Sequence, residues 1–243
     1  MSEAASRRWI LITGASRGIG AAIARKCAGP QTGLILWATE EASVQDIAAE
    51  CQALGSKVVS MGVNLLEPVS IEAAWHAVLR HCSGNLHALI NNAGIWIERP
   101  IDPLQWYDWE NAMTVNLRAP MRLSALASAV MGDGASIVFI ASVASRKSYG
   151  GGANYCAAKF GLLGFAGALF EDLRERGIKV ISILPGQVNT DMHKGEAGIV
   201  TERLIDPEDV ADAVSWAMAT PSRVCPSEIT LLPQRNPKPR KRS

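Results

Sequence analysis

The sequence predicts one α/β domain: a doubly wound parallel sheet of about seven strands with helices on both faces. Short apolar runs of strand length alternate with longer segments of helical periodicity along the whole chain, an order typical of parallel sheets. The apolar runs are continuous, as expected for strands covered on both faces. At 243 residues the chain has the size of one such domain.

Each expected element has its own signal in the sequence. The strands are the short apolar runs at residues 9–13, 34–38, 57–63, 86–91, 136–141, 179–184 and 229–232. The helices are the periodic segments at 19–28, 41–54, 69–82, 106–130, 153–176 and 207–219. The last helix has the clearest start, because Asp206 stands at the N-cap and Pro207 at the first helical position.

The charge is unevenly distributed along the chain. The formal net charge is +1, yet the last nine residues contain five cations, so the rest of the chain carries −4. We therefore expect a catalytic domain at 1–233 and a basic, disordered tail at 234–243. The whole-chain charge of +1 therefore gives no case for nucleic acid binding. The tail alone could raise one, but charged ends are more often simply solvated.

Cysteines, histidines and chain ends exclude several protein classes. The five cysteines are odd in number and scattered, unlike a secreted disulfide framework, and no His/Cys spacing suits a metal. No apolar run reaches the roughly 18 residues of a membrane span, and the N-terminus lacks a secretory pattern. We expect a soluble, cytoplasmic protein without a metal and without a membrane partner.

A glycine-rich turn follows the first expected strand. Residues 13–20 read TGASRGIG and lead directly into a helix. Glycines permit a tight turn and close approach of backbone N–H groups to a pyrophosphate, which the helix N-terminus also favours. The plain alternative is an ordinary strand-to-helix turn, but the position at the first βα junction favours the dinucleotide site of a Rossmann fold.

Five motifs then occur in order. They are TGASRGIG, Asn-Asn-Ala-Gly at 91–94, Ser142, Tyr-Cys-Ala-Ala-Lys at 155–159 and Pro-Gly at 185–186. Together they resemble the short-chain dehydrogenase/reductase family, and the resemblance covers about residues 8–232. It implies a hydride transfer between a nicotinamide dinucleotide and a carbonyl compound or secondary alcohol, as in NADP-dependent carbonyl and 3-oxoacyl reductases.

Tyr155 and Lys159 are four residues apart in a helical segment and so share one face. A nearby ammonium favours the phenolate, so we expect Lys159 to lower the pKa of Tyr155. Such a pair is usually an ordinary exposed pair, but Ser142 ends a strand at the edge where parallel sheets bind ligands. The resemblance implies Tyr155 as general acid/base, Ser142 as the group polarising the substrate oxygen, and Asn116 in a water-linked proton relay. For Asn116 the alternative is a helix residue that satisfies a backbone carbonyl.

The resemblance also implies a set of cofactor-binding residues. Besides Tyr155 and Lys159 they are Gly14, Ser16, Arg17, Gly18, Ile19, Gly20, Thr39, Asn64, Leu65, Asn91, Ala93, Gly94, Pro185, Gly186, Val188 and Thr190. Asn64 departs from the family, in which many members have an aspartate that touches the adenine.

NADP(H) is favoured over NAD(H). The second strand does not end in the acidic residue of NAD-selective members, since Ala38 and Thr39 precede Glu40. Arg17 stands where a basic residue of the family commonly meets the 2′-phosphate, and a guanidinium pairs well with phosphate. The alternative is that Arg17 points to solvent and Glu40 turns back to the ribose.

The substrate is expected to be a hydrophobic ketone, aldehyde or secondary alcohol. The expected pocket residues are Trp96, Ser142, Ala144, Tyr149, Tyr155, Gln187 and Met192. The polar loop 188–201, with two glycines, resembles a mobile lid. The C-terminus lacks the glycine-rich ending of many family reductases that act on acyl-carrier-protein substrates, which lowers the case for fatty-acid elongation.

The resemblance implies a homo-oligomer, a dimer or a tetramer, built through long helices such as 106–130 and 153–176. Two alternatives stay open. One is an oxidative, NAD-linked alcohol dehydrogenase with the same residues. The other is a regulator that senses the dinucleotide without chemistry, although such proteins tend to lose the Tyr or the Lys of the site.

Overall fold

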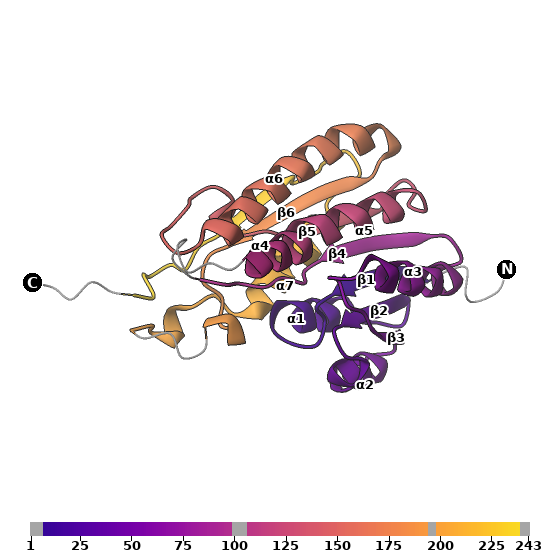
Figure 1. Cartoon of the computed structure of the whole chain (residues 1–243). Helices are drawn as coiled ribbons and strands as arrows, with labels where there is room; N and C mark the ends of the chain where they lie inside the picture. The colour runs from indigo at the N-terminus through magenta and orange to yellow at the C-terminus, as the bar shows by residue number, and fades with distance from the viewer. Residues whose placement is uncertain (1–6, 99–105, 194–197, 239–243) are drawn as a thin grey trace, which may run out of the picture.

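The computed structural model describes residues 7–98, 106–193 and 198–238. A single sheet of seven parallel strands runs through the molecule in the order β3-β2-β1-β4-β5-β6-β7 (Figure 1). The strands are β1 Arg8–Thr13, β2 Thr32–Ala38, β3 Lys57–Gly62, β4 Leu86–Asn91, β5 Ser136–Ile140, β6 Lys179–Pro185 and β7 Glu228–Leu231. The predicted fold class is confirmed.

Helices connect the strands. They are α1 Gly18–Cys27, α2 Gln45–Ala53, α3 Pro68–Cys82, α4 Trp106–Met113, α5 Ala119–Ser128, α6 Ala153–Leu173 and α7 Pro207–Ala219. Short 3₁₀ turns occur at Glu41–Val44, Val143–Ser145, Arg174–Arg176, Asp191–His193 and Thr201–Arg203. The start of α7 is as predicted: the backbone N–H of Asp206 donates to the Asp209 carboxylate at 3.0 Å, as in a capping box.

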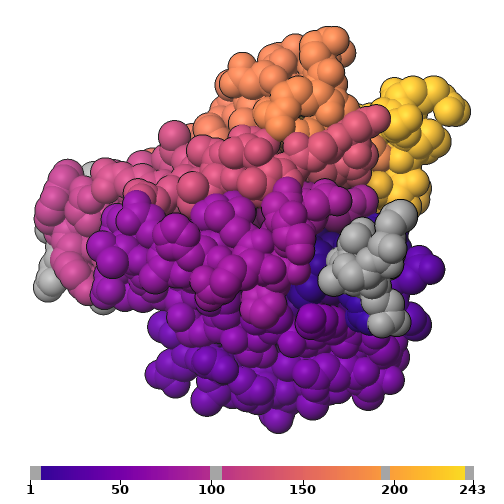
Figure 2. Space-filling view, turned by 90° about the vertical axis from the view of Figure 1, so that its right-hand side faces the viewer, coloured from indigo at the N-terminus to yellow at the C-terminus, as the bar shows by residue number. Residues whose placement is uncertain are grey.

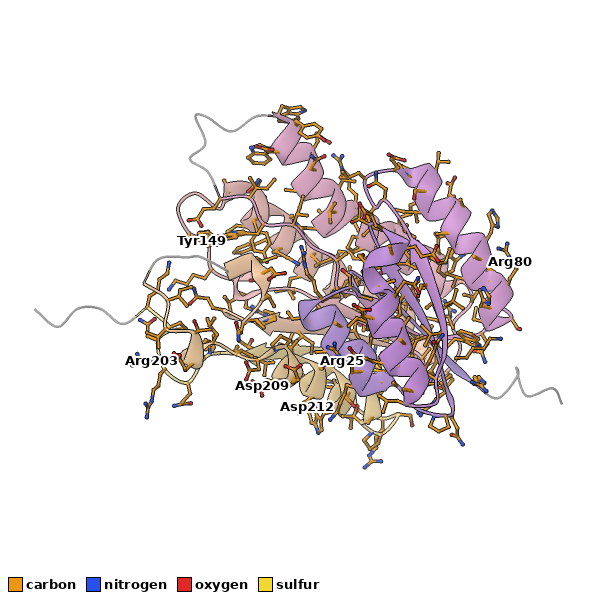
Figure 3. The ribbon with its side chains drawn as sticks, turned by 90° about the horizontal axis from the view of Figure 1, so that it is seen from below. Arg25, Arg80, Tyr149, Arg203, Asp209 and Asp212 are labelled. Atoms are coloured by element: carbon orange, nitrogen blue, oxygen red, sulfur yellow. The ribbon has the colours of Figure 1, made fainter. Side chains whose placement is uncertain are left out.

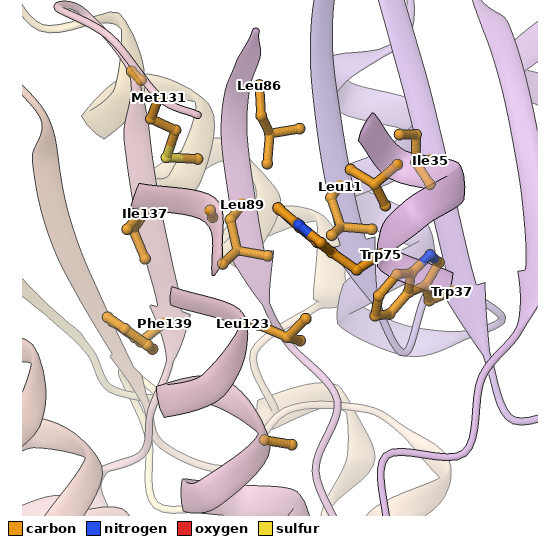
Figure 4. Packing of buried hydrophobic residues seen from close by; sticks show 14 of the residues in the cluster. Leu11, Ile35, Trp37, Trp75, Leu86, Leu89, Leu123, Met131, Ile137 and Phe139 are labelled. Atoms are coloured by element: carbon orange, nitrogen blue, oxygen red, sulfur yellow. The ribbon is translucent and has the colours of Figure 1, made fainter. Parts of the chain in front are cut away.

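The apolar core has two layers, one on each face of the sheet. Helices α3, α5 and α6 cover one face, and Figure 4 shows Trp75 of α3 beside the strand residue Leu11 in this cluster. Helices α1, α2 and α7 cover the other face. Because each strand contributes side chains to both layers, its sequence is apolar without alternation.

The expected helix 106–130 is interrupted. Residues Thr114–Arg118 form a π-helical turn between α4 and α5. Pro120 explains the change, since a proline has no N–H and its ring collides with the carbonyl four residues earlier, here that of Asn116. The widened turn accommodates the proline without ending the helix.

The sheet has its topological switch between β1 and β4, where the strand order reverses. In open α/β sheets, ligands bind in the crevice outside the carboxyl ends of the strands at such a point. In Figure 3 Tyr149 and Arg203 lie toward one end of the molecule and Arg80 toward the other. Arg80 is in the last turn of α3, just before β4 begins, so the end with Tyr149 is the carboxyl edge.

The two halves of the chain adjoin along the sheet. In the space-filling view of Figure 2, the purple N-terminal half lies below the magenta and orange C-terminal half. In the ranges that the structure describes, no helix is long and apolar enough to cross a bilayer. Residues 234–238 of the predicted tail contact the body: the N–H of Val200 donates to the carbonyl of Pro237 at 2.9 Å. Residues 239–243 lie outside the described ranges.

Candidate active site

The glycine-rich turn packs backbone against backbone. A Cβ on Gly20 would lie 2.2 Å from the carbonyl oxygen of Gly14, and one on Gly14 would lie 2.9 Å from the Cα of Ala93. Gly14 also has a φ of 64°, in the left-handed region that favours glycine. These contacts bring the start of α1 against the Asn-Asn-Ala-Gly segment after β4, at the carboxyl edge of the sheet.

Two side chains outside the predicted set of site residues hold this turn. The hydroxyl of Thr13 accepts hydrogen bonds from the backbone N–H groups of Asn92 and Ala93, each at 3.0 Å, and donates to the carbonyl of Ile90. The Asn92 amide donates to the carbonyls of Thr13 and Gly14 at 2.9 and 3.0 Å. The signal was present in the sequence, because a threonine directly before the first glycine ends a buried strand.

The turn suits a dinucleotide. The first turn of α1 has no acidic side chain, and the first N–H groups of a helix have no partner within it, so an anion is favoured there. Beside it, the Oδ1 of Asn91 is buried and has no hydrogen-bond partner among the described residues, while its Nδ2 donates to Ser124 at 3.4 Å. This acceptor suits a hydroxyl group such as those of a ribose.

The loop after β6 reaches the same place. Thr190 stands close to the glycine-rich turn, since a Cβ on Gly18 would lie 3.1 Å from its Cγ2. The loop is tied to the body by a β-bridge between Val188 and Ile205 and by the N–H of Gly186, which donates to Leu231 at 2.8 Å. It therefore crosses the crevice from β6 to the N-terminus of α1. Residues 194–197 of the predicted lid lie outside the described ranges.

The predicted catalytic residues come together. Ser142 follows β5 and caps the next 3₁₀ turn, accepting the N–H of Ala144 at 3.1 Å, and it lies close enough to Tyr155 to lower the pKa of that phenol. Tyr155 and Lys159 lie one turn apart on α6, both buried. Lys159 donates to the carbonyl of Ile140 at 2.9 Å. The end of β5 therefore positions Lys159 through this hydrogen bond and Ser142 through the chain itself.

The expected lowering of the Tyr155 pKa is wrong for the chain as described. Burial raises the pKa of Tyr155 to about 12, against a smaller lowering effect of the Ser142 hydroxyl. Burial also lowers the pKa of Lys159 to about 8. The reason is geometric: the Lys159 ammonium lies 5.6 Å from the centre of the Tyr155 ring and directs its hydrogen bond to Ile140, so desolvation decides both pKa values.

Asn116 lies in the π-helical turn, fully buried. Its amide donates to the carbonyl of Ile95 at 2.8 Å, and its Oδ1 accepts the N–H of Ile95 at 3.0 Å. The side chain thus has the structural role that was the alternative, pinning the segment after Gly94 to the helix. A Cβ on Gly94 would lie 3.0 Å from this Oδ1 and 3.9 Å from the Lys159 Nζ, so Asn116 is nevertheless close to Lys159, one of the predicted catalytic residues.

The residues expected to contact the adenosine part of the cofactor make contacts only with nearby parts of the chain. Thr39 is exposed directly after β2. Asn64 uses its side chain in the turn before α3, donating to Glu67 at 2.9 Å and accepting from the N–H of Leu66. Leu65 packs against the core. Contact of these residues with a cofactor stays a prediction.

Arg17 is largely exposed to solvent but also has an ion-pair partner. Its Nε lies 3.4 Å from the Oδ2 of Asp191, across the crevice, although both side chains are largely exposed. Asp191 follows Thr190 directly, so this ion pair is a second link between the turn and the loop after β6. Asp191 was not among the predicted site residues, because its partner is remote in sequence and no spacing links the two.

Of the expected pocket residues, Trp96 and Ala144 pack together with Tyr155, and Trp96 donates a hydrogen bond to Tyr149. Gln187 and Met192 lie on the loop after β6, and no hydrogen bond among the described residues joins either to Tyr155. Trp96, Ala144 and Tyr149 thus lie around Tyr155 through direct contacts, and the contribution of Gln187 and Met192 to a substrate pocket stays a prediction.

Comparison with known proteins agrees with this geometry. A family described as short chain dehydrogenase matches residues 8–198. The 3-oxoacyl-[acyl-carrier-protein] reductase FabG of Escherichia coli (strain K12) is 36% identical over 217 residues, which are 85% of this chain and 87% of the relative.

Solved structures also match nearly the whole chain. A dehydrogenase/reductase from Sinorhizobium meliloti 1021 has a TM-score of 0.85 at 30% identity and covers 96% of this chain and 98% of its own. A short chain dehydrogenase from Burkholderia cenocepacia J2315 in complex with NADP has a TM-score of 0.85 at 29% identity, covering 95% and 98%. The chain therefore belongs to the short-chain dehydrogenase/reductase family and is an NAD(P)-dependent oxidoreductase.

Proposed function

We propose that this protein reduces the carbonyl group of an apolar small molecule with NADP(H), with Tyr155 as the proton donor. The observation that carries the proposal is that the Ser142 hydroxyl lies close enough to the Tyr155 phenol to lower its pKa, at the carboxyl edge of the sheet and beside the glycine-rich turn. When bound, the dinucleotide supplies the hydride.

The two hydroxyls have complementary roles. Ser142 holds and polarises the carbonyl oxygen, and Tyr155 delivers the proton to it. With a pKa of about 12, Tyr155 is a phenol at neutral pH, which is the form that donates. The oxidative, NAD-linked alternative uses the same two hydroxyls in reverse, and the substrate panel below separates the two directions.

Lys159 and Asn116 are assigned supporting roles in the proton transfer. The Lys159 ammonium is held by the Ile140 carbonyl one helical turn from Tyr155, and the resemblance gives it a hydrogen bond to the nicotinamide ribose. Because Pro120 has no N–H, the carbonyl of Asn116 loses its α-helical donor. We assign the relay role to this main-chain carbonyl, since the side chain is committed to Ile95.

The dinucleotide would be held along the crevice. The N–H groups around Gly18 would take the pyrophosphate, Asn91 a ribose hydroxyl, and Thr190 the carboxamide. The remaining contacts implied by the resemblance are those of Gly14, Ser16, Ile19, Gly20, Thr39, Asn64, Leu65, Ala93, Gly94, Pro185, Gly186 and Val188.

NADP is the favoured form. The cation of Arg17 stands at the start of α1, where a 2′-phosphate would find a charge-assisted partner. The Burkholderia structure is a complex with NADP. The Glu40 alternative has the weaker case, because Glu40 lies two residues after the end of β2 rather than at its last position.

A second substrate class follows from the comparison. FabG is named as a 3-oxoacyl-[acyl-carrier-protein] reductase, so a 3-oxoacyl thioester is a candidate beside simple ketones, although the C-terminus lacks the glycine-rich ending. Assembly into a homo-oligomer is supported by exposed apolar side chains on the long helices, Trp106 and Tyr107 on α4 and Phe160 on α6, whose burial against a second copy would be favourable.

The test is a panel of ketones, aldehydes, 3-oxoacyl thioesters and alcohols with both cofactors, using the wild-type protein and Tyr155→Phe. We expect NADPH-dependent carbonyl reduction that falls by about 10²–10⁴-fold in Tyr155→Phe, while fluorescence titration shows NADPH still binding. Full activity of Tyr155→Phe would refute the mechanism. Binding of NADPH without turnover of any compound would favour the regulator.

A further inference from the structure

Two loops beside the catalytic phenol are joined by a pair of aromatic side chains. Trp96 lies in the segment after β4, and Tyr149 precedes α6. The indole N–H of Trp96 donates to the Tyr149 hydroxyl oxygen at 2.7 Å, a short distance for an N–H donor. The indole has one donor, and this hydrogen bond satisfies it.

The pair flanks Tyr155. Trp96 packs against the small cluster of Ala144, Tyr155 and Cys156. The Tyr149 ring lies against the start of α6, since a Cβ on Gly152 would be 2.5 Å from two of its ring atoms. Tyr149 is also near enough to raise the pKa of Tyr155. In Figure 3 Tyr149 lies at the end of the molecule that holds the carboxyl edge of the sheet, where the site is.

The loops approach each other at a second point. A Cβ on Gly151 would lie 3.1 Å from the Cγ of Glu98, so the segment after β4 and the segment before α6 are also in contact two residues beyond the aromatic pair. Three consecutive glycines, Gly150–152, follow Tyr149, and Gly151 has a φ of 80°. Such a run lets the backbone change direction at low steric cost, as hinges do.

We propose that Trp96 and Tyr149 form a hydrogen-bonded aromatic gate that restricts the site to slender carbonyl compounds. Bulky compounds reach Ser142 and Tyr155 only when the hydrogen bond breaks and Tyr149 turns away on the glycine run. Tyr149 is 41% exposed, so both polar groups find water when the gate opens and the net cost is small. The inference rests on the proposed function, because it takes Tyr155 as the proton donor.

The test compares Trp96→Phe, Tyr149→Phe and the double variant on a small aliphatic ketone and a bicyclic aryl ketone. Each single variant removes the hydrogen bond and retains a ring. We expect each to raise kcat/KM for the bicyclic ketone relative to the small one by about two- to tenfold, the range of one net hydrogen bond. The double variant should change the ratio no more than either single variant, since both remove the same bond.

Matched controls come from exposed aromatic residues elsewhere. Tyr107→Phe on α4 and Trp216→Phe on α7 make the same chemical changes at side chains that are 68% and 61% exposed. Both should leave the ratio unchanged. Tryptophan emission gives a readout without turnover: Tyr149→Phe should shift the emission when Trp96 is present and should leave it unchanged in the Trp96→Phe background.

The possible results separate the gate from the proposed function. An unchanged size preference in active variants, or additive effects of the two single variants, would overturn the gate and leave the proposed function intact. An emission change by Tyr149→Phe that persists without Trp96 would also overturn the gate, because the pair would not be coupled. A wild-type protein that reduces no carbonyl compound with either cofactor would refute the proposed function and the gate with it.

Discussion

The ammonium nitrogen of Lys159 lies 5.6 Å from the centre of the Tyr155 ring, and both side chains are almost fully buried. Burying an ammonium costs free energy unless a partner compensates. Here the hydrogen bond to the Ile140 carbonyl at 2.9 Å is part of the compensation. The lowered pKa of Lys159, about 8, shows that it is incomplete.

Stability should therefore depend on pH through Lys159. Its pKa is lowered from 10.5 to about 8 in the folded protein, so the unfolded chain binds the proton more tightly. The contribution of Lys159 to stability is present above pH 10.5 and is lost as the pH falls through 8. The free energy of unfolding of the wild-type protein, minus that of Lys159→Met, should rise by up to about 3 kcal/mol over this window.

Urea unfolding at a series of pH values from 7 to 10 measures most of this difference. Comparison between variants cancels the cysteines, whose titration both proteins share. Lys147→Met removes an exposed ammonium from the loop before α6 and serves as the control, with a flat difference. A difference that is equally flat for Lys159→Met would show that Lys159 retains its ordinary proton affinity.

Thr13→Val should destabilise the protein without changing the volume of its core. The Thr13 hydroxyl is buried and accepts two backbone N–H groups, those of Asn92 and Ala93. Valine leaves both donors without this acceptor, which we expect to cost about 2–4 kcal/mol in chemical unfolding. KM for the cofactor should rise as the turn loosens.

Thr32→Val is the matched control for this change. Thr32 is also buried in the sheet, but among the described residues its hydroxyl makes no side-chain hydrogen bond. The substitution there should cost less than about 1 kcal/mol. Equal losses at both positions would mean that the hydroxyl contacts of Thr13 contribute nothing specific.

The sequence predicted the strands because each buried strand is a short apolar run. It also predicted that Ser142, Tyr155 and Lys159 meet, since they lie at the end of one strand and on one helix face. It did not predict the π-helical turn around Asn116, because apolar periodicity continues through Pro120, although that proline was the available signal. The sequence also did not predict the direction of the pKa shift of Tyr155. Spacing predicts which side chains are neighbours, whereas the extent of burial decides whether the pKa rises or falls.

Gly20→Ala should abolish tight cofactor binding. The added Cβ would lie 2.2 Å from the Gly14 carbonyl oxygen, a backbone atom that moves only with the turn, so we expect overpacking to destabilise the fold by about 1–3 kcal/mol. Gly164→Ala is the control, since Gly164 lies within α6, is exposed, and a Cβ added to it would meet nothing within 4 Å. It should be neutral or stabilise by up to about 1 kcal/mol. Fluorescence titration with NADPH and thermal unfolding measure both effects.

In the arrangement proposed, Arg17 interacts both with Asp191 and with the 2′-phosphate of the cofactor. The carboxylate lies 3.4 Å from the Arg17 Nε, so it offsets positive charge where a 2′-phosphate would bind. An exposed ion pair contributes little to stability. Its removal should therefore change cofactor selectivity more than folding.

Arg17→Met and Asp191→Asn should shift cofactor preference in opposite directions. Arg17→Met should raise KM for NADPH by about tenfold, the value of one charge-assisted hydrogen bond, with KM for NADH nearly unchanged. Asp191→Asn retains the shape of the side chain and removes its charge, so the ratio of kcat/KM for NADPH to that for NADH should rise by about two- to fivefold. Initial rates with both cofactors at fixed ionic strength give the ratio, because screening weakens exposed charges. If Arg17→Met affected both cofactors equally, Arg17 would contact a group that they share, and the assignment of the 2′-phosphate to it would be wrong.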